Sequence, residues 1–335
     1  MTRAARPWLW PLVPVYQLAL ALRDVQLRTG LKPVRRLRRP VVSVGNLSAG
    51  GAGKTPLVIA RAKALTARGV QVDVLSRGYG RRRSALPLLV DPVGTSEQFG
   101  DEPLVIAREA QVPVFVATER YQAGLLAERR SALSGFGLHL LDDGFQHRQL
   151  ARDVDILLLG HGDLNDRLLP AGNLRESLRA AGRADVFAIP EDEPEVEEWV
   201  KSRGWKGTVW RVRRRMDVPA IDGPVVAFCG IARPEPFFEG LESAELDRAG
   251  LRVAARFAFP DHHRYTAGDL ERMAAAAQKA GAAALLTTEK DRARLGGLTA
   301  SLPASVPLKT VPLCVEIEGE AAAIEWLMRR VRGEG

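Results

Sequence analysis

Cysteine is scarce in this chain of 335 residues, which contains two, Cys229 and Cys314. Two thiols so far apart in sequence exclude a disulfide scaffold and a thiolate zinc site, and they are typical of a protein of the reducing cytoplasm. We interpret both as core residues. Histidine is scarce as well, with five in the chain, and no further ligands accompany His262 and His263 at a spacing that zinc requires.

The sequence also lacks a hydrophobic run long enough to span a bilayer. Residues 8–22 are apolar apart from Gln17, but as a helix this segment reaches only about 22 Å, against about 30 Å for the hydrocarbon core. Pro11 and Pro14 also interrupt its first half. A membrane-spanning helix is therefore not expected.

Acidic residues are outnumbered by basic ones, 40 to 48, which gives a formal charge of +8. This excess favours anionic partners: nucleotide phosphates, phospholipid headgroups or nucleic acid. Charge does not choose among these three classes. The sequence shows no zinc-finger spacing and no interleaved aromatic and basic ribonucleoprotein motif, so we expect no nucleic-acid partner.

A glycine-rich segment joins an apolar run at 41–44 to a segment of helical spacing that starts near Pro56. This is the strand, loop and helix context of a phosphate-binding loop. Lys54 would hold the β- and γ-phosphate oxygens of ATP, and Thr55 would ligate Mg²⁺. The match to G-x-x-x-x-G-K-[ST] departs at the first position, where Ser48 replaces glycine. The predicted nucleotide-binding residues are Ser48, Ala49, Gly50, Gly51, Ala52, Gly53, Lys54 and Thr55.

This nucleotide motif bears on the amino-terminal segment, for which three interpretations remain. Residues 19–21 resemble a signal-peptide cleavage site. Export would, however, separate the nucleotide motif from ATP, which is supplied in the cytoplasm. The segment is otherwise an interfacial anchor, with Trp8, Trp10 and Tyr16 at headgroup depth, or a helix packed on the protein core. We favour the anchor because a basic stretch follows it, and we therefore expect contact with an anionic membrane surface.

Length and pattern predict an α/β protein of two domains. A chain of this length, with 46% apolar residues, exceeds what one core usually supports, and its β-rich runs alternate with helical segments as in parallel βαβ units. We expect a P-loop NTPase-like parallel sheet with helices on both faces, plus a smaller α/β domain. The predicted divisions are 1–30 for a membrane-associated segment, 31–218 for the P-loop domain and 219–335 for the smaller domain. The predicted strands are 41–44, 70–75, 114–117, 138–141, 154–159, 186–189, 225–229, 253–259, 284–287 and 308–317, and residues 208–212 form a strand or a connector.

Two acidic pairs are candidates for chemistry. An apolar strand ends in Asp142 and Asp143, which suits a Walker B site for the metal, although Asp-Asp-Gly is also a common turn sequence. Asp101 and Glu102 stand in a segment without strand character, where a turn is the more common outcome. Their local sequence alone does not identify them as catalytic.

A pair of histidines, His262 and His263, follows the predicted strand at 253–259. The carboxyl end of a strand is a common place for a cleft in α/β proteins. Local sequence alone favours polar loop residues, so a functional role for this pair depends on the wider context.

Seven motifs together resemble the tetraacyldisaccharide 4′-kinase family, also called lipid A 4′-kinases. They occur in family order across nearly the whole chain, and the joint signal is stronger than any single motif. The motifs are GNLSAGGAGKTP at 45–56, SRGYGR at 76–81, GDEP at 100–103, LDDGFQH at 141–147, LPAGNLRE at 169–176, FPDHH at 259–263 and TTEKD at 287–291.

The resemblance implies transfer of the ATP γ-phosphate to the 4′-hydroxyl of a tetraacyl glucosamine disaccharide 1-phosphate in lipid A biosynthesis. It also implies a monotopic protein at the cytoplasmic face of the inner membrane of a Gram-negative bacterium. This location agrees with the anchor favoured above.

Residue by residue, the resemblance places Lys54 and Thr55 on the family's phosphate and magnesium residues. It places Asp142 and Asp143 on its Walker B pair. Asp101 falls on an acidic residue that acts with a histidine in that family, and we assign this histidine to His262, with His263 as the alternative. Five further residues fall in or near family motifs and are expected to line the cleft and contact the substrate: Glu102, Arg120, His147, Asn173 and Arg175.

A sugar hydroxyl is too weak an acid to ionise by itself at neutral pH, so a positioned base accelerates its attack by roughly 10²- to 10⁴-fold. We expect His262 to be that base, oriented by Asp101 from the other domain, with domain closure bringing the pair together. The alternative class is a P-loop switch ATPase, in which no acceptor is phosphorylated. The deviant loop of partitioning ATPases carries a lysine before Gly-Gly, where this chain has Ala49.

Overall fold

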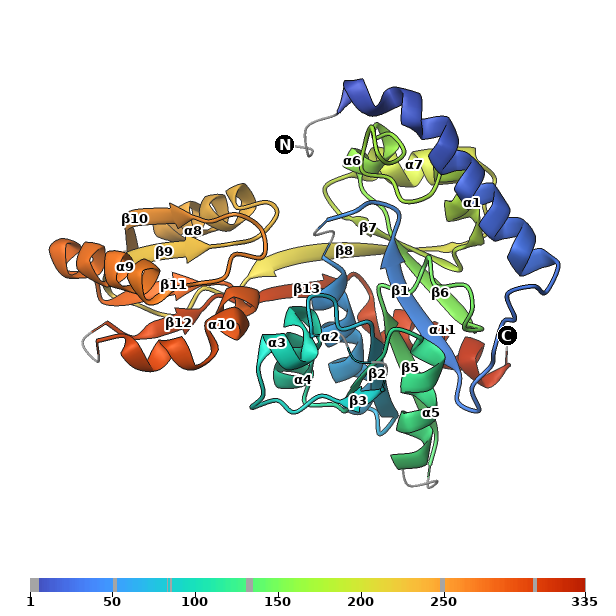
Figure 1. Cartoon of the computed structure of the whole chain (residues 1–335), viewed down its shortest axis with the longest axis horizontal. Helices are drawn as coiled ribbons and strands as arrows, with labels where there is room; N and C mark the ends of the chain where they lie inside the picture. The colour runs from blue at the N-terminus through green and yellow to red at the C-terminus, as the bar shows by residue number, and fades with distance from the viewer. Residues whose placement is uncertain are drawn as a thin grey trace.

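The computed structural model describes residues 6–50, 53–82, 84, 86–130, 135–247, 251–303 and 306–334. They form two lobes, a larger one built on a sheet of nine strands and a smaller one built on a sheet of four (Figure 1). The α/β class predicted from the alternating pattern is confirmed.

The larger sheet is parallel except at its two edges. Its strands are β1 (Val41–Asn46), β2 (Gln71–Ser76), β3 (Leu88–Leu89), β4 (Val114–Val116), β5 (Gly137–Asp142), β6 (Val154–Leu158), β7 (Val186–Pro190), β8 (Thr208–Met216) and β13 (Leu313–Ile317). They lie in the order β13-β8-β7-β6-β1-β5-β2-β4-β3, and only β13 and β3 run antiparallel to their neighbours. Every residue of β1, β5 and β6 is buried, as expected for central parallel strands covered on both faces.

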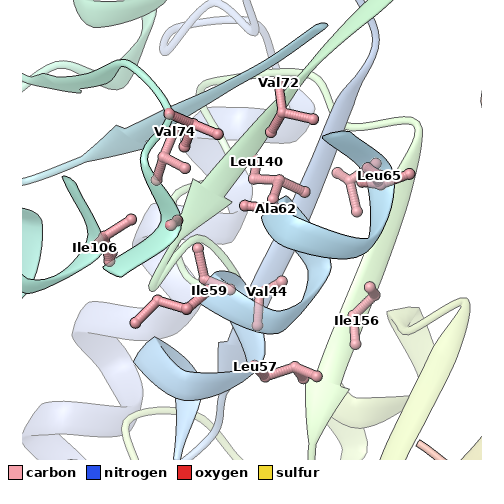
Figure 2. Close-up of a cluster of buried hydrophobic side chains, with 14 of the residues drawn as sticks. Val44, Leu57, Ile59, Ala62, Leu65, Val72, Val74, Ile106, Leu140 and Ile156 are labelled. Carbon is pink, nitrogen blue, oxygen red and sulfur yellow. The ribbon is translucent and has the colours of Figure 1, made fainter. Parts of the chain in front are cut away.

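Helices cover both faces of this sheet. One face packs against α2 (Lys54–Thr66), α4 (Asp101–Ala110) and α11 (Glu320–Arg332), and the other against α5 (Arg120–Arg130), the 3₁₀ helix η2 (Leu178–Arg183) and α7 (Pro194–Ser202). In α2, the buried residues Val58, Ala62 and Leu65 recur at helical spacing. Figure 2 shows this side of α2 against strand residues such as Val44 and Leu140. Two short helices complete the lobe, α3 (Ser96–Phe99) and α6 (His161–Leu164).

The smaller lobe is a four-stranded parallel sheet in the order β10-β9-β11-β12. Its strands are β9 (Gly223–Cys229), β10 (Leu251–Ala258), β11 (Ala284–Thr287) and β12 (Leu308–Thr310). One face packs on α8 (Glu235–Asp247), and the other on α9 (Ala267–Ala280), α10 (Glu289–Leu295) and the 3₁₀ helix η3 (Gly296–Ser301). The α10 helix also reaches the larger core through Ala293.

The chain returns to the larger lobe at its carboxyl end. The predicted strand at 308–317 is two strands, because Pro312 interrupts it and has no amide to donate to a ladder. β12 lies in the smaller sheet, while β13 pairs with β8 at the edge of the larger one. Helix α11 then packs on the larger core through Ala323, Ile324 and Leu327. The predicted smaller domain, 219–335, therefore includes a final strand and helix that belong to the larger sheet.

The amino-terminal segment folds as a 3₁₀ helix, η1 (Pro7–Leu12), and a helix, α1 (Val13–Arg28), along the outside of the larger lobe (Figure 1). Neither contains a buried residue, and the Trp8 side chain is 73% exposed. In the described part of the chain, no helix combines the length and the apolar composition that crossing a bilayer requires.

Gly45 in β1 lets the Asp142–Asp143 turn approach the phosphate-binding strand. A Cβ atom on Gly45 would lie 2.6 Å from the Phe145 Cβ atom and 2.8 Å from its backbone nitrogen. Gly45→Ala should therefore force the two segments apart and lower the free energy of unfolding by about 1–3 kcal/mol. Thermal unfolding measures this loss. Gly297→Ala, where the added methyl meets open space, is the control, and equal melting temperatures for the two variants would contradict the argument.

Candidate active site

The glycine-rich loop after β1 presents Lys54 at the start of α2. Gly53 has a φ of +82°, a left-handed conformation that glycine adopts without strain. Lys54 and Thr55 are buried, and the Lys54 Nζ donates to the Asn46 Oδ1 at 2.8 Å. The same Nζ lies 3.2 Å from the Asp143 Oδ1. Two predicted loop residues, Gly51 and Ala52, lie outside the described residues.

The carboxylates at the end of β5 lie beside this loop because Val44 of β1 is in register with Asp142. Asp142 accepts a hydrogen bond from the Ser76 hydroxyl at 3.0 Å, while its buried Oδ1 has no partner among the described residues. Burial, reinforced by the like charges of Glu102 and Asp143, raises the pKa of Asp142 to about 7. Part of this shift comes from neighbouring carboxylates, whose repulsion a bound cation would reduce.

Asp143 is ionised by contrast. It sits at a φ of +49° and pairs with both Lys54 and Arg175, whose guanidinium is 2.7 Å away. Burial opposes its charge, but these two cations outweigh that effect and lower the pKa of Asp143 to about 2. Ionised carboxylate and hydroxyl oxygens are the donors that Mg²⁺ prefers. Asp143 and the unpartnered Asp142 oxygen are of this donor type, as is the hydroxyl of the buried Thr55 at the start of α2.

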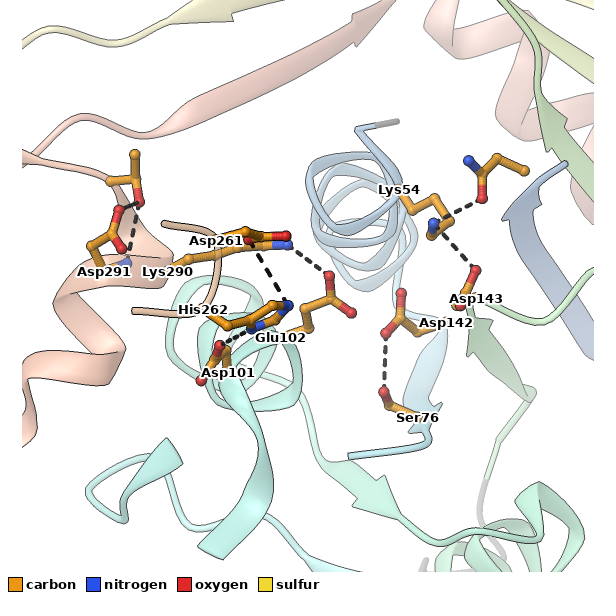
Figure 3. A network of polar contacts seen from close by, with 12 residues as sticks. Lys54, Ser76, Asp101, Glu102, Asp142, Asp143, Asp261, His262, Lys290 and Asp291 are labelled. Atoms are coloured by element: carbon orange, nitrogen blue, oxygen red, sulfur yellow. Dashed lines mark hydrogen bonds and ion pairs between the residues drawn. The ribbon is translucent and has the colours of Figure 1, made fainter. Parts of the chain in front are cut away.

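A second group of polar residues joins the two lobes at the first turn of α4 (Figure 3). The Asp101 Oδ2 lies 3.0 Å from the His262 Nδ1 and accepts from the Arg294 Nε at 2.6 Å. Burial acts to raise the pKa of the Asp101 carboxyl, yet the His262 hydrogen bond and the Arg294 charge hold it below its ordinary value. Asp101 is therefore an ionised acceptor, and we assign the His262 Nδ1 as its donor, although the Arg294 Nη2, which can only donate, also lies 3.2 Å from that nitrogen.

The two adjacent histidines have different partners. His263 lies 3.0 Å from Asp269 and stacks on the Phe259 ring, with centroids 4.6 Å apart. His262, with a φ of +58° and a 46% exposed side chain, turns the other way toward Asp101. The structure thus brings together Asp101 and the histidine that we assigned to it.

Sequence reasoning missed two cations of α10 that complete this junction. Lys290 donates to Glu102 at 2.6 Å, and Arg294 holds Asp101. The two are four residues apart and so lie on one helix face. This spacing, directly after a predicted strand, could have indicated the two cations in the sequence. Such a pair on a helix is, however, more often exposed to solvent.

The other predicted substrate residues gather near the loop, but several already have protein partners. Arg120 is buried, which lowers its pKa to about 10, and it donates to the Thr118 carbonyl at 3.0 Å. Burial, together with the nearby Arg120, lowers the pKa of His147 to about 3, so its ring is neutral at physiological pH. The Asn173 side chain donates to Asp166 at 2.7 Å, and the Asn173 backbone carbonyl accepts from the Ala49 amide at 2.8 Å.

A pocket of about 90 Å³ opens beside the loop and reaches both lobes. Ser48, Ala49 and Gly50 line one side, and Arg214 of β8 and Arg233 of the smaller lobe line another. The Arg214 Nε would lie 3.2 Å from a Cβ atom placed on Gly53. A larger pocket of about 630 Å³ lies away from this chemistry, between the end of β7, α7, β8 and β13.

A family model described as Tetraacyldisaccharide-1-P 4′-kinase matches residues 5–332. The chain belongs to this kinase family. The tetraacyldisaccharide 4′-kinase of Koribacter versatilis is 40% identical over 329 residues, which cover 95% of this chain and 97% of the relative. That of Anaeromyxobacter sp. (strain K) is 36% identical over 337 residues, covering 92% and 86%.

A solved structure of the kinase family has the same fold. It is the crystal structure of the "apo" form of LpxK from Aquifex aeolicus in complex with ATP, with a TM-score of 0.75 and 32% identity. The match covers 98% of this chain and 100% of that one. The family and the P-loop kinase fold expected from the seven motifs are confirmed.

Proposed function

We propose that this chain transfers the γ-phosphate of ATP to the 4′-hydroxyl of a tetraacyl glucosamine disaccharide 1-phosphate, a step of lipid A biosynthesis. Membership of the kinase family supports this reaction. The observation that carries it is the proximity of two groups: Lys54 with Asp143 in the larger lobe, and Asp101 with His262 between the lobes (Figure 3). A switch ATPase has no need of a base for an acceptor alcohol.

The loop side provides the phosphate donor site. Lys54 and the amides at the start of α2 are placed to hold the terminal phosphates, since a helix amino end attracts anions. Thr55, Asp142 and Asp143 would hold Mg²⁺. When bound, this ion neutralises charge on the β- and γ-phosphate oxygens. Contacts with Asp143 and Asn46 hold the Lys54 ammonium group, which would lie beside the terminal phosphates.

The junction side provides the base. With its Nδ1 hydrogen donated to Asp101, a neutral His262 keeps a lone pair on Nε2 for the proton of the attacking hydroxyl. Asp101 stabilises the resulting imidazolium, and Arg294 fixes Asp101 in turn. His262 and Arg294 come from the smaller lobe and Asp101 from the larger one, so the base is assembled only when the lobes meet.

The outer surface of η1 and α1 supports contact with an anionic membrane, which we place at the cytoplasmic face of the bacterial inner membrane. Exposed apolar side chains recur there every three or four residues, at Leu12, Val15, Leu18, Leu22 and Val25. This is the pattern of a helix that lies in the membrane interface. An acylated acceptor would be held in the same bilayer.

The two candidate activities differ in their need for an acceptor. With a detergent-solubilised disaccharide 1-phosphate present, we expect ADP release to rise at least about tenfold, because the bound alcohol is oriented for attack and water is not. Release of ADP and transfer of labelled phosphate to the glycolipid are measured together. Equal ADP release with and without the acceptor, and no label on the lipid, would instead identify a switch ATPase.

A further inference from the structure

Polar side chains attach α1 to the larger lobe. The Tyr16 hydroxyl donates to the Arg175 carbonyl oxygen at 2.8 Å, and Arg23 forms an ion pair with Glu176. Glu176 is buried, and its other oxygen accepts from Arg183 at 2.5 Å. Tyr16, which we expected at headgroup depth, therefore faces the protein while the apolar stripe of α1 faces outward.

Further contacts of the amino-terminal segment reach the same stretch of chain. The Arg6 amide donates to the Ala171 carbonyl at 2.9 Å, and the Arg167 guanidinium lies over the Trp10 ring, 4.7 Å from its centroid. We call residues 167–176 the strap. Four separate contacts thus connect the segment formed by Arg6, η1 and α1 to the strap.

The opposite side of the strap supports the phosphate-binding loop. The Arg175 amide donates to the Leu47 carbonyl at 2.7 Å, and the Ala49 amide donates to the Asn173 carbonyl at 2.8 Å. The Arg175 guanidinium holds Asp143, which pairs with Lys54. One residue, Arg175, therefore contacts the outer helix through its carbonyl, the loop through its amide and the Walker B pair through its side chain.

We propose that α1 positions the phosphate-binding site through the strap, so that seating α1 on a membrane raises the rate of phosphoryl transfer as well as concentrating the enzyme there. Tyr16 is the positioning residue. In water the helix is held mainly by polar contacts, each of which stabilises only modestly. Local opening of such an element is therefore easy.

A bilayer favours the docked helix over the open one. In the docked state, α1 offers its apolar stripe to the membrane while the charge of Arg23 is paired with Glu176. Undocking would break this pair and leave the buried Glu176 with Arg183 as its close cation. A membrane that takes up the outward stripe while the lobe lies against it would also restrict α1 to its docked orientation. A surface that binds one state better shifts the population toward it. The inference rests on the proposed kinase function and adds a regulation of the same site.

The test compares the unchanged chain with Tyr16→Phe, which removes one hydroxyl and keeps the apolar ring. The acceptor is a disaccharide 1-phosphate without acyl chains, so that partitioning into lipid does not limit delivery. Vesicles of phosphatidylglycerol and phosphatidylethanolamine are added at saturating ATP and acceptor, which isolates kcat from KM. We expect the vesicles to raise kcat of the unchanged chain about fivefold, the size of one hydrogen bond.

Tyr16→Phe should sediment with the vesicles as well as the unchanged chain does, yet respond less than about twofold in kcat. Thr29→Val is the matched control, because its hydroxyl donates to the Val25 carbonyl at the end of the same helix; it should keep the full response. Melting temperatures establish that each variant is folded.

Two results would overturn the inference and leave the kinase function standing: transfer that vesicles do not stimulate, or equal stimulation of Tyr16→Phe and the unchanged chain. Absence of transfer to any acceptor, acylated or not, would overturn the proposed function and the inference with it. If stimulation were lost only together with vesicle binding, α1 would merely concentrate the enzyme at the membrane, and the inference would also be overturned.

Discussion

Lys54→Ala should lower the rate of phosphate transfer to the glycolipid by about 10²- to 10³-fold, the loss expected when a fixed electrostatic contact to the transition state is removed. Its Nζ is held by Asn46 and Asp143, so it needs little reorganisation when the phosphate arrives. The substitution also leaves Asp143 with Arg175 as its remaining close cation. Transfer of labelled phosphate under saturating ATP measures the loss.

Lys63→Ala is the matched control for this variant. Lys63 lies on the same helix, α2, but at its exposed end, and its replacement should change transfer by less than about twofold, as for most surface positions. A Lys54→Ala enzyme that keeps the parental rate while Lys63→Ala behaves as expected would remove the phosphate-binding role from this loop.

His262→Ala and Asp101→Ala should each lower kcat by roughly 10²- to 10⁴-fold, which is the contribution of a positioned general base. The affinity for ATP should change little, because Lys54 and the loop stay intact. Since the two side chains act as one unit, the double variant should be hardly slower than the worse single one. Steady-state kinetics of the three variants, with ATP binding measured separately, test this.

His263→Ala is the control for the histidine. Its ring contacts Asp269 and Phe259 and not Asp101, so we expect a loss of stability and nearly parental turnover in the folded fraction. If His263→Ala lost turnover and His262→Ala did not, the roles of the two histidines would have to be exchanged.

Most strands and the loop could be predicted because their signals are local. The central strands are short β-rich runs buried on both faces, and their observed bounds lie within one or two residues of the predicted ones. The prediction of a single strand at 308–317 was wrong. A proline inside an apolar run is compatible with one irregular strand or two, and only the tertiary contacts show that β12 and β13 enter different sheets.

The site was harder to predict because its contacts join distant parts of the chain. Asp101 and His262 are separated by 161 residues, and only the family resemblance connected them. Two adjacent histidines look alike in sequence, and the left-handed backbone at His262 helps to turn one toward Asp101. Lys290 and Arg294 were missed because a pair of cations on a helix face usually meets water, and so was Tyr16, whose hydroxyl reaches a carbonyl 159 residues away.

The smaller lobe is an insertion between two strands that run side by side. The chain leaves the larger sheet at the end of β8 and re-enters at the start of β13, where Met216 and Leu313 are paired. Two adjacent connections allow the smaller lobe to move toward the larger one, but they resist its rotation about its own long axis. Each closure would therefore return His262 to Asp101 along the same path. The two side chains would then reach the same relative position in every turnover.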